Sequence, residues 1–308
     1  MVLAIMEQMA AFALMLTIGF LCARTRIVTV ASLPSAISLS TKVFLPAMLF
    51  SVVCERVTKD LVIEHLPIVV LAALLYALAI GVTKLLAMVL HLKGSVSAAF
   101  RMVFVFGNTG FIGLPVLVAV FPETGAVNLI LFMLVDQVVF WTYGIALARA
   151  EARPPDWRSM LKGILNPNIA AIALALGCLL ADVRTSDVAV GFLETIGAAA
   201  TPLCMICLGA LCCFAHPKRI LLKRELYVGT IVKMVALPLT LAPLLKLLPL
   251  PADISLSMVL MAGMPPTVLV PLVVEANKGA ASYATSLSVV TIVFSVITLP
   301  IVSHLAGM

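Results

Sequence analysis

The stretch GNTGFIGLP, residues 107–115, interrupts an otherwise apolar segment with three glycines, an Asn-Thr pair and a proline. Pro115 has no backbone N–H, and its ring clashes with the carbonyl group of Phe111 in a regular helix. The glycines tolerate backbone angles that other residues avoid. We therefore expect a break in the helix here. Unwound backbone inside a membrane persists only where protein or a hydrated cavity satisfies its polar groups.

The rest of the sequence places this break in a lipid bilayer. Of the 308 residues, 63% are hydrophobic and only 11% are charged, and the mean hydropathy is +1.21. Because soluble domains carry about 25% charged residues, we expect most of this chain to face lipid. A helix needs roughly 20 apolar residues to cross the hydrocarbon core, so ten spans with short connections would nearly fill the chain.

Apolar runs separated by charged residues, prolines or glycines predict an all-α integral membrane protein with ten transmembrane helices. Barrel strands would alternate apolar and polar residues, and these runs do not. The expected spans cover residues 2–22, 32–53, 67–92, 95–121, 126–147, 164–181, 188–214, 226–247, 254–274 and 281–305.

The charged loops predict an orientation. Thirteen Lys and Arg residues fall in the odd-numbered loops and four in the even-numbered loops. Since cytoplasmic loops are enriched in Lys and Arg, we expect the odd loops inside and both termini outside. The net charge of +6 then follows from topology and from contact with membrane lipid, and nucleic-acid binding is not expected.

The two halves of the chain show signs of duplication. A polar stretch at residues 150–163 is a predicted cytoplasmic linker between a first unit, residues 1–149, and a second, residues 164–308. Three residue pairs are each separated by 156 positions: Gly107 and Gly263, Pro115 and Pro271, and Pro46 and Pro202. Five spans per half is an odd number, so a repeat would be inverted. Unrelated helices with scattered prolines are the alternative.

The ninth expected span contains a comparable break, GMPPTVLVP at residues 263–271. Helix segments starting near Pro115 and Pro271 would direct their N-termini, each about half a positive charge, at one point from opposite sides. Such a point suits a carboxylate, to which the Asn108 amide and threonine hydroxyls can donate hydrogen bonds. Alternatively, Asn108 caps carbonyl groups freed by the break. The expected binding set is Asn108, Thr109, Gly110, Pro115, Pro266, Thr267 and Pro271.

Four charged residues inside expected spans are candidates for ion coupling or for supporting the site: Lys42, Lys84, Asp136 and Lys233. A charge at the bilayer centre costs about 2.5–3.5 kcal/mol on insertion scales and usually lines a pathway or meets a partner. Lys84 and Lys233 can instead extend to the inner interface. Asp136 can be a protonatable coupling group, with H⁺ or Na⁺ as coupling ion, or the structural partner of a lysine.

Metal binding, cofactors and catalysis are not expected. Cys204 and Cys207 have C-x-x-C spacing, but no His or carboxylate is near them in the sequence, which favours packing over a metal site. The sequence has no Walker A, G-x-S-x-G or H-E-x-x-H motif. Small residues such as Gly191 and Ala198 are too common in membrane spans to predict a homodimer, which stays open.

Three segments resemble the auxin efflux carrier family: NTGFIGLP at 108–115, FLPA at 44–47 and LKGILNPNIA at 161–170. The resemblance covers essentially the whole chain, and the family includes plant auxin carriers and bacterial permeases described as malonate transporters. It implies two inverted repeats of five spans, with spans one, two, six and seven as a scaffold. The remaining spans would form a transport domain with crossing helices four and nine. The short fifth loop resembles that of bacterial members, which implies a bacterial inner membrane.

The resemblance also implies roles for residues. Asn108 matches the family's substrate-contacting asparagine, and Pro115 and Pro271 match its crossover prolines. Lys84 is similar in place to a lysine of the third span, but Ile80 stands where plant members have an acidic partner, so auxin itself is not expected. The implied activity is secondary active or facilitative transport, by alternating access, of a small carboxylate such as malonate or an auxin-like acid. A membrane sensor or scaffold without transport, and a passive anion channel, are the alternatives.

Overall fold

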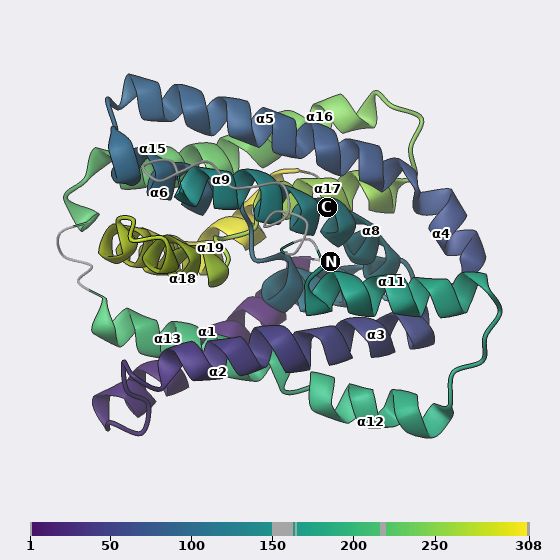
Figure 1. Ribbon diagram of the computed structural model, residues 1–308. Coiled ribbons are helices and arrows are strands. Elements are labelled where there is room, and N and C mark those ends of the chain that lie inside the picture. Colours follow the sequence, from purple (N-terminus) through teal and green to yellow (C-terminus); the bar gives the residue numbers. More distant parts are fainter. Residues whose placement is uncertain (1, 150–162, 164, 216–219, 307–308) are drawn as a thin grey trace.

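The computed structural model describes residues 2–149, 163, 165–215 and 220–306 (Figure 1). Within these ranges the chain is helical and contains no strand. Seven helical stretches are long and apolar enough to cross a membrane: Val2–Arg24, Leu33–Arg56, Pro67–Val89, Gly125–Ala148, Asp187–Phe214, Arg224–Lys246 and Ala281–Leu305. These are the properties of an all-helical integral membrane protein, as the composition predicts.

Three of the ten expected spans correspond to shorter helices. The fourth consists of α6 (Gly94–Val105), the π-helical turn η2 (Thr109–Gly113) and α7 (Leu114–Val120). The ninth consists of α17 (Ala252–Ala262) and α18 (Leu269–Ala276), and the sixth of α11 (Pro167–Leu180). Each break thus lies where glycine and proline predict it, while the total of ten spans stays a prediction. The predicted linker lies outside the described residues except for Gly163.

Three π-helical turns are each followed by a helix with proline at its second position. They are η1 (Ser40–Phe44) before α3 (Leu45–Arg56), η2 before α7, and η4 (Val232–Ala236) before α16 (Leu237–Lys246). Because proline lacks an N–H, the carbonyl group four residues earlier loses its helical partner, and the wider π-turn accommodates this loss. A fourth turn, η3 (Phe140–Gly144), joins α8 (Gly125–Val139) to α9 (Ile145–Ala148).

The helices pack in two groups (Figure 1). The first comprises α1 (Val2–Arg24), α2 (Leu33–Leu39), η1, α3, α11, α12 (Asp187–Gly197) and α13 (Ala200–Phe214). The second comprises α4 (Lys59–His65), α5 (Pro67–Val89), α6, η2, α7, α8, η3, α9, α15 (Arg224–Ile231), η4, α16, α17, α18 and α19 (Ala281–Leu305). Contacts of α1 with α7 and α19 join the groups.

Two glycines bring α1 and α13 of the first group into backbone contact. A Cβ atom at Gly19 would lie 2.0 Å from the carbonyl oxygen of Ile206, and one at Gly209 would lie 2.0 Å from that of Leu16. No side chain fits at such a distance, so these positions require glycine. Small residues permit this kind of close helix crossing in membrane proteins.

Large apolar side chains are exposed on the outer surface of both groups. Leu14 of α1, Leu74 of α5 and Leu174 of α11 are each more than half exposed. An apolar surface of this extent is expected of helices that face lipid. The polar side chains of the two breaks are instead buried inside the protein.

Candidate functional site

The two breaks meet in the interior and pair through their backbones. The N–H of Asn108 donates to the carbonyl oxygen of Pro265 at 2.7 Å, and the N–H of Thr267 donates to that of Phe106 at 3.2 Å. Gly107 and Pro266 thereby form one antiparallel bridge. Each break thus satisfies polar backbone groups that the other leaves unpaired, as burial among apolar helices requires.

The first break is shorter than the sequence suggests. Only residues 106–108 leave the helix, and the backbone is helical again from Thr109. The π-turn before Pro115 accommodates the missing hydrogen bond without further unwinding. At Gly107 a Cβ atom would lie 3.0 Å from the Cβ atom of Met264, so glycine permits the close approach of the second break.

Asn108 has one amide atom paired and one unpaired. Its side chain is 1% exposed. Its Oδ1 accepts a hydrogen bond from the Phe111 N–H at 3.3 Å and so caps the start of η2. Its Nδ2 has no hydrogen-bond partner in the part of the chain that the structure describes. Asn108 therefore caps a backbone N–H group and not the carbonyl groups freed by the break. Its Nδ2 is left as an unused donor.

A cavity of about 20 Å³ lies between both breaks, α8 and the start of α11. Five of the sequence-predicted residues line it: Asn108, Thr109, Gly110, Asp136 and Thr267. A water molecule needs roughly 10–15 Å³ of such space, so the cavity holds about one water and is too small for an organic anion. We call this arrangement, in which no organic anion fits between these residues, the closed form.

Asp136 is buried in α8 at the wall of this cavity. The Tyr76 hydroxyl of α5 donates to its Oδ1, and the Gln137 Nε2 donates to its Oδ2 at 3.1 Å. The Thr109 hydroxyl faces the same carboxylate, and Lys233 of η4 interacts with it electrostatically. Asp136 and Lys233 are thus buried within electrostatic range of each other, but they line different cavities, and no direct ion pair joins them among the described residues.

Two hydrogen bonds connect the site to the first helix group. Thr201 of α13 donates from its hydroxyl to the carbonyl oxygen of Phe111 at 3.2 Å. This is the carbonyl that Pro115 leaves without its helical partner. Asn166, the N-cap of α11, donates from its Nδ2 to the Oε1 of Gln137 at 3.3 Å. The site therefore lies at the boundary between the two groups.

Asn168 is a cavity residue to which the sequence assigns no role. It lies in the first turn of α11 and lines the cavity, and its buried Oδ1 has no hydrogen-bond partner among the described residues. The triplet at residues 166–168 is recognisable as a helix start because Asn166 is a good N-cap and Pro167 a good first residue. That signal does not reveal that the start of this helix faces the breaks.

The remaining sequence-predicted residues do not line the cavity. Pro115 and Pro271 lie early in α7 and α18, and Pro266 contributes its backbone to the bridge. Lys42 and Lys84 have exposed side chains on η1 and α5. Of the four charged candidates, therefore, only Asp136 and Lys233 are buried at or near the breaks.

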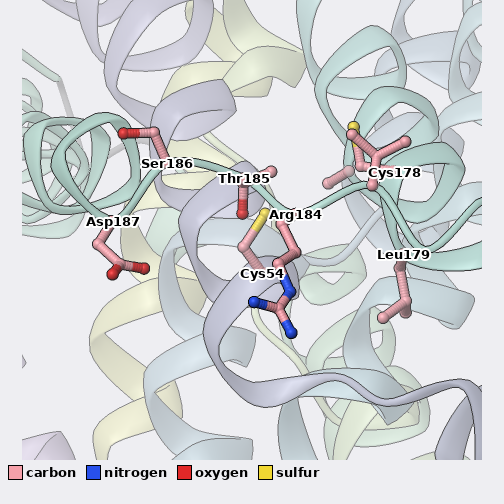
Figure 2. Close-up of a pocket in the computed structure, with 9 residues that line it drawn as sticks. Cys54, Cys178, Leu179, Arg184, Thr185, Ser186 and Asp187 are labelled. Atoms are coloured by element: carbon pink, nitrogen blue, oxygen red, sulfur yellow. The ribbon is translucent and has the colours of Figure 1, made fainter.

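A second cavity, of about 430 Å³, lies in the first helix group at the ends of α3 and α11. Figure 2 shows Arg184, Thr185, Ser186 and Asp187 along the connection that leads into α12, with Cys54 of α3 beside them. Its lining contains both a guanidinium and a carboxylate group, so it shows no preference for one sign of charge. It shares no residue with the cavity at the breaks.

Comparison with known proteins places the chain in a family. Residues 4–303 match a family model described as membrane transport protein, and comparison with curated proteins gives no match. The matched range contains both breaks, Asn108 and Asp136. Because it covers nearly the whole of a chain whose helices can cross a membrane several times, this protein belongs to the membrane transport protein family, which includes the auxin efflux carriers.

Proposed function

We propose that the protein is a secondary transporter that carries a small organic anion, such as a short mono- or dicarboxylate, across the cytoplasmic membrane by alternating access. The observation that carries the proposal is the unpaired Nδ2 of Asn108, buried at a cavity where two interrupted helices meet. A buried donor without a partner is costly, and it gains a hydrogen bond when an acceptor enters the cavity.

The helix starts around the cavity favour a negatively charged ligand. Thr109 begins the helical segment η2–α7, Leu269 begins α18, and Asn168 lies in the first turn of α11. All three residues line the cavity. The N-terminal end of a helix carries roughly half a positive charge, so three helix starts around one cavity favour an anion there. Their first N–H groups are already capped by Asn108, Asn166 and Thr267, so the helix dipoles supply this preference.

Alternating access needs a fixed unit and a moving unit, and we assign these roles to the two helix groups. We take the chain as two inverted repeats of five spans with both termini outside, the first group as the scaffold and the second as the moving unit. The cavity of about 20 Å³ excludes an organic anion, so its walls must separate before one enters. Movement at the boundary crossed by the Thr201–Phe111 and Asn166–Gln137 hydrogen bonds would open it.

Uptake of radiolabelled malonate into proteoliposomes, with unlabelled mono- and dicarboxylates as competitors, tests this function. We expect saturable, competable uptake by the wild type and its loss in Asn108→Ala. Asn277→Ala is a matched control, because Asn277 lies at the end of α18 and bonds Arg149 and Val273 away from the cavity. Wild-type uptake by Asn108→Ala would refute the site, and uptake linear in concentration would indicate a channel.

A further inference from the structure

The unpaired donor of Asn108 and the carboxylate of Asp136 share one small cavity. Asp136 is only 4% exposed and Asn108 only 1%. An anion that accepts a hydrogen bond from Asn108 therefore lies beside a second negative charge, between side chains that are otherwise buried. We propose that each anion is carried together with one proton, and that Asp136 binds this proton when the anion enters. This proposal rests on the proposed function.

Two carboxylates that share a buried site do not both stay ionised, and the pair retains one proton. Lys233 is a cation that could allow both carboxylates to stay ionised. It lines a separate small cavity among Ala79, Phe104 and Leu237, however, and Asp136 is absent from that lining. One lysine balances one carboxylate. Lys233 therefore compensates Asp136 in the empty site and leaves the charge of an arriving anion unbalanced.

The other elements packed against α8 bring few charged or titratable groups to Asp136. Tyr76 reaches it from α5. His65 of α4 and Asp253 of α17 instead meet α8 at Asn128, eight positions earlier in the helix. The side chains that face Asp136 from η2 and from its own helix are the uncharged Thr109 and Gln137, and Lys84 of α5 is exposed.

The groups around Asp136 suit a proton better than a metal cation. A cation such as Na⁺ needs several oxygen lone pairs directed at one point, as hard cations generally do. Here Tyr76 and Gln137 direct hydrogens at the carboxylate. The Oε1 of Gln137 already accepts hydrogen bonds from Trp141 and Asn166. Among the described residues, no group of three or more His, Cys, Asp or Glu side chains could hold a metal ion.

The transport cycle balances in charge and protons. A proton from the water on the entry side binds a carboxylate oxygen of Asp136 as the anion accepts a hydrogen bond from Asn108. On the exit side the anion leaves and the proton returns to water. The empty protein then moves back with Asp136 ionised and held by Tyr76 and Gln137. A monoanion is therefore carried without net charge, and an anion gradient moves protons.

Gradient-driven uptake tests proton coupling separately from transport. Proteoliposomes in Na⁺-free buffer, with the membrane potential held at zero by valinomycin and equal K⁺, receive labelled malonate under an acid-outside pH gradient. We expect wild-type accumulation to rise by up to about tenfold per imposed pH unit. Whatever malonate exchange Asp136→Asn retains across a gradient-free membrane is expected not to respond to the imposed pH gradient, so this accumulation is lost. Accumulation by Asp136→Asn equal to that of the wild type would overturn the proposal.

A second measurement covers the case in which Asp136→Asn does not fold. Wild-type vesicles containing a pH-sensitive dye should acidify inside when malonate is added outside, and Asn108→Ala vesicles report passive leak. Saturable malonate uptake without acidification, or accumulation driven by Na⁺ and not by the pH gradient, would contradict proton coupling while leaving the transporter intact. Absence of saturable uptake under every condition would instead refute the proposed function, and the coupling with it.

Discussion

At the scale of single residues, the cavity is defined by two asparagines whose amides are only partly satisfied. Asn108 uses its Oδ1 to cap η2 and leaves Nδ2 unpaired, and Asn168 has an unpaired Oδ1 across the boundary between the helix groups. Buried polar atoms without partners are rare in native proteins and call for an explanation. A carboxylate that occupies the open form of the cavity accepts a hydrogen bond from the Asn108 Nδ2, and it can take one from Asn168 only through that residue's Nδ2.

Asn168→Ala should raise the KM for malonate severalfold without lowering stability. The side chain has an acceptor that makes no hydrogen bond in the closed form, so its removal leaves no new unpaired group. Asn166→Ala is the matched control from the same helix start. It removes a cap that bonds the N–H groups of Asn168 and Ile169 and should cost about 1 kcal/mol. Thermal unfolding and uptake kinetics distinguish the two variants, and an unchanged KM in Asn168→Ala would argue against its role.

At the scale of helices, glycine determines how closely α1 and α13 pack. Gly209→Val should destabilise the protein by about 1–3 kcal/mol or more, because even its Cβ atom would meet the backbone of Leu16 at 2.0 Å. Gly177→Ala on α11 is the control, since a Cβ atom there meets nothing within 4 Å, and alanine favours the helix by up to about 1 kcal/mol. Melting temperatures in detergent measure both. A Gly209→Val protein as stable as the Gly177→Ala protein would be inconsistent with a close crossing.

The helix breaks were predictable from sequence, but their dimensions were not. Gly107 and the prolines at 265 and 266 mark the interruptions, because they limit or forbid regular helix. Pro115 does not, because the helix begins again at Thr109 and passes Pro115 through a π-turn. The unwound stretch is short because the N–H of Asn108 finds the Pro265 carbonyl, a contact between residues far apart in the chain. The burial of individual lysines could not be predicted from the sequence either. Lys84 is exposed and Lys233 is buried. Because both helices are apolar all round, the sequence does not show which face of each helix is buried.

At the scale of the whole molecule, the boundary between the helix groups is crossed beside the cavity by the Thr201–Phe111 and Asn166–Gln137 hydrogen bonds, and farther out by the Lys59–Asp182 ion pair. Thr201→Val removes the buried hydrogen bond between the Thr201 hydroxyl and the Phe111 carbonyl, at a cost of about 1 kcal/mol to the closed form. If opening breaks this contact, the loss destabilises only the closed form, and the population of the open form rises by roughly fivefold. Hydrogen exchange of the backbone amides at residues 106–114 should rise accordingly. Thr195→Val is the control, because its hydroxyl bonds Gly191 within its own helix, and equal exchange in both variants would contradict an opening at this boundary.

The central claim is that an anion binds where the two breaks meet and is carried by alternation of access. Counterflow in proteoliposomes tests it most directly. Vesicles containing excess unlabelled malonate are diluted into a trace of labelled malonate, and the label inside is followed with time. We predict a transient accumulation above equilibrium for the wild type and none for Asn108→Ala. Uptake that approaches equilibrium without any overshoot in the wild type, or an undiminished overshoot in Asn108→Ala, would contradict the account.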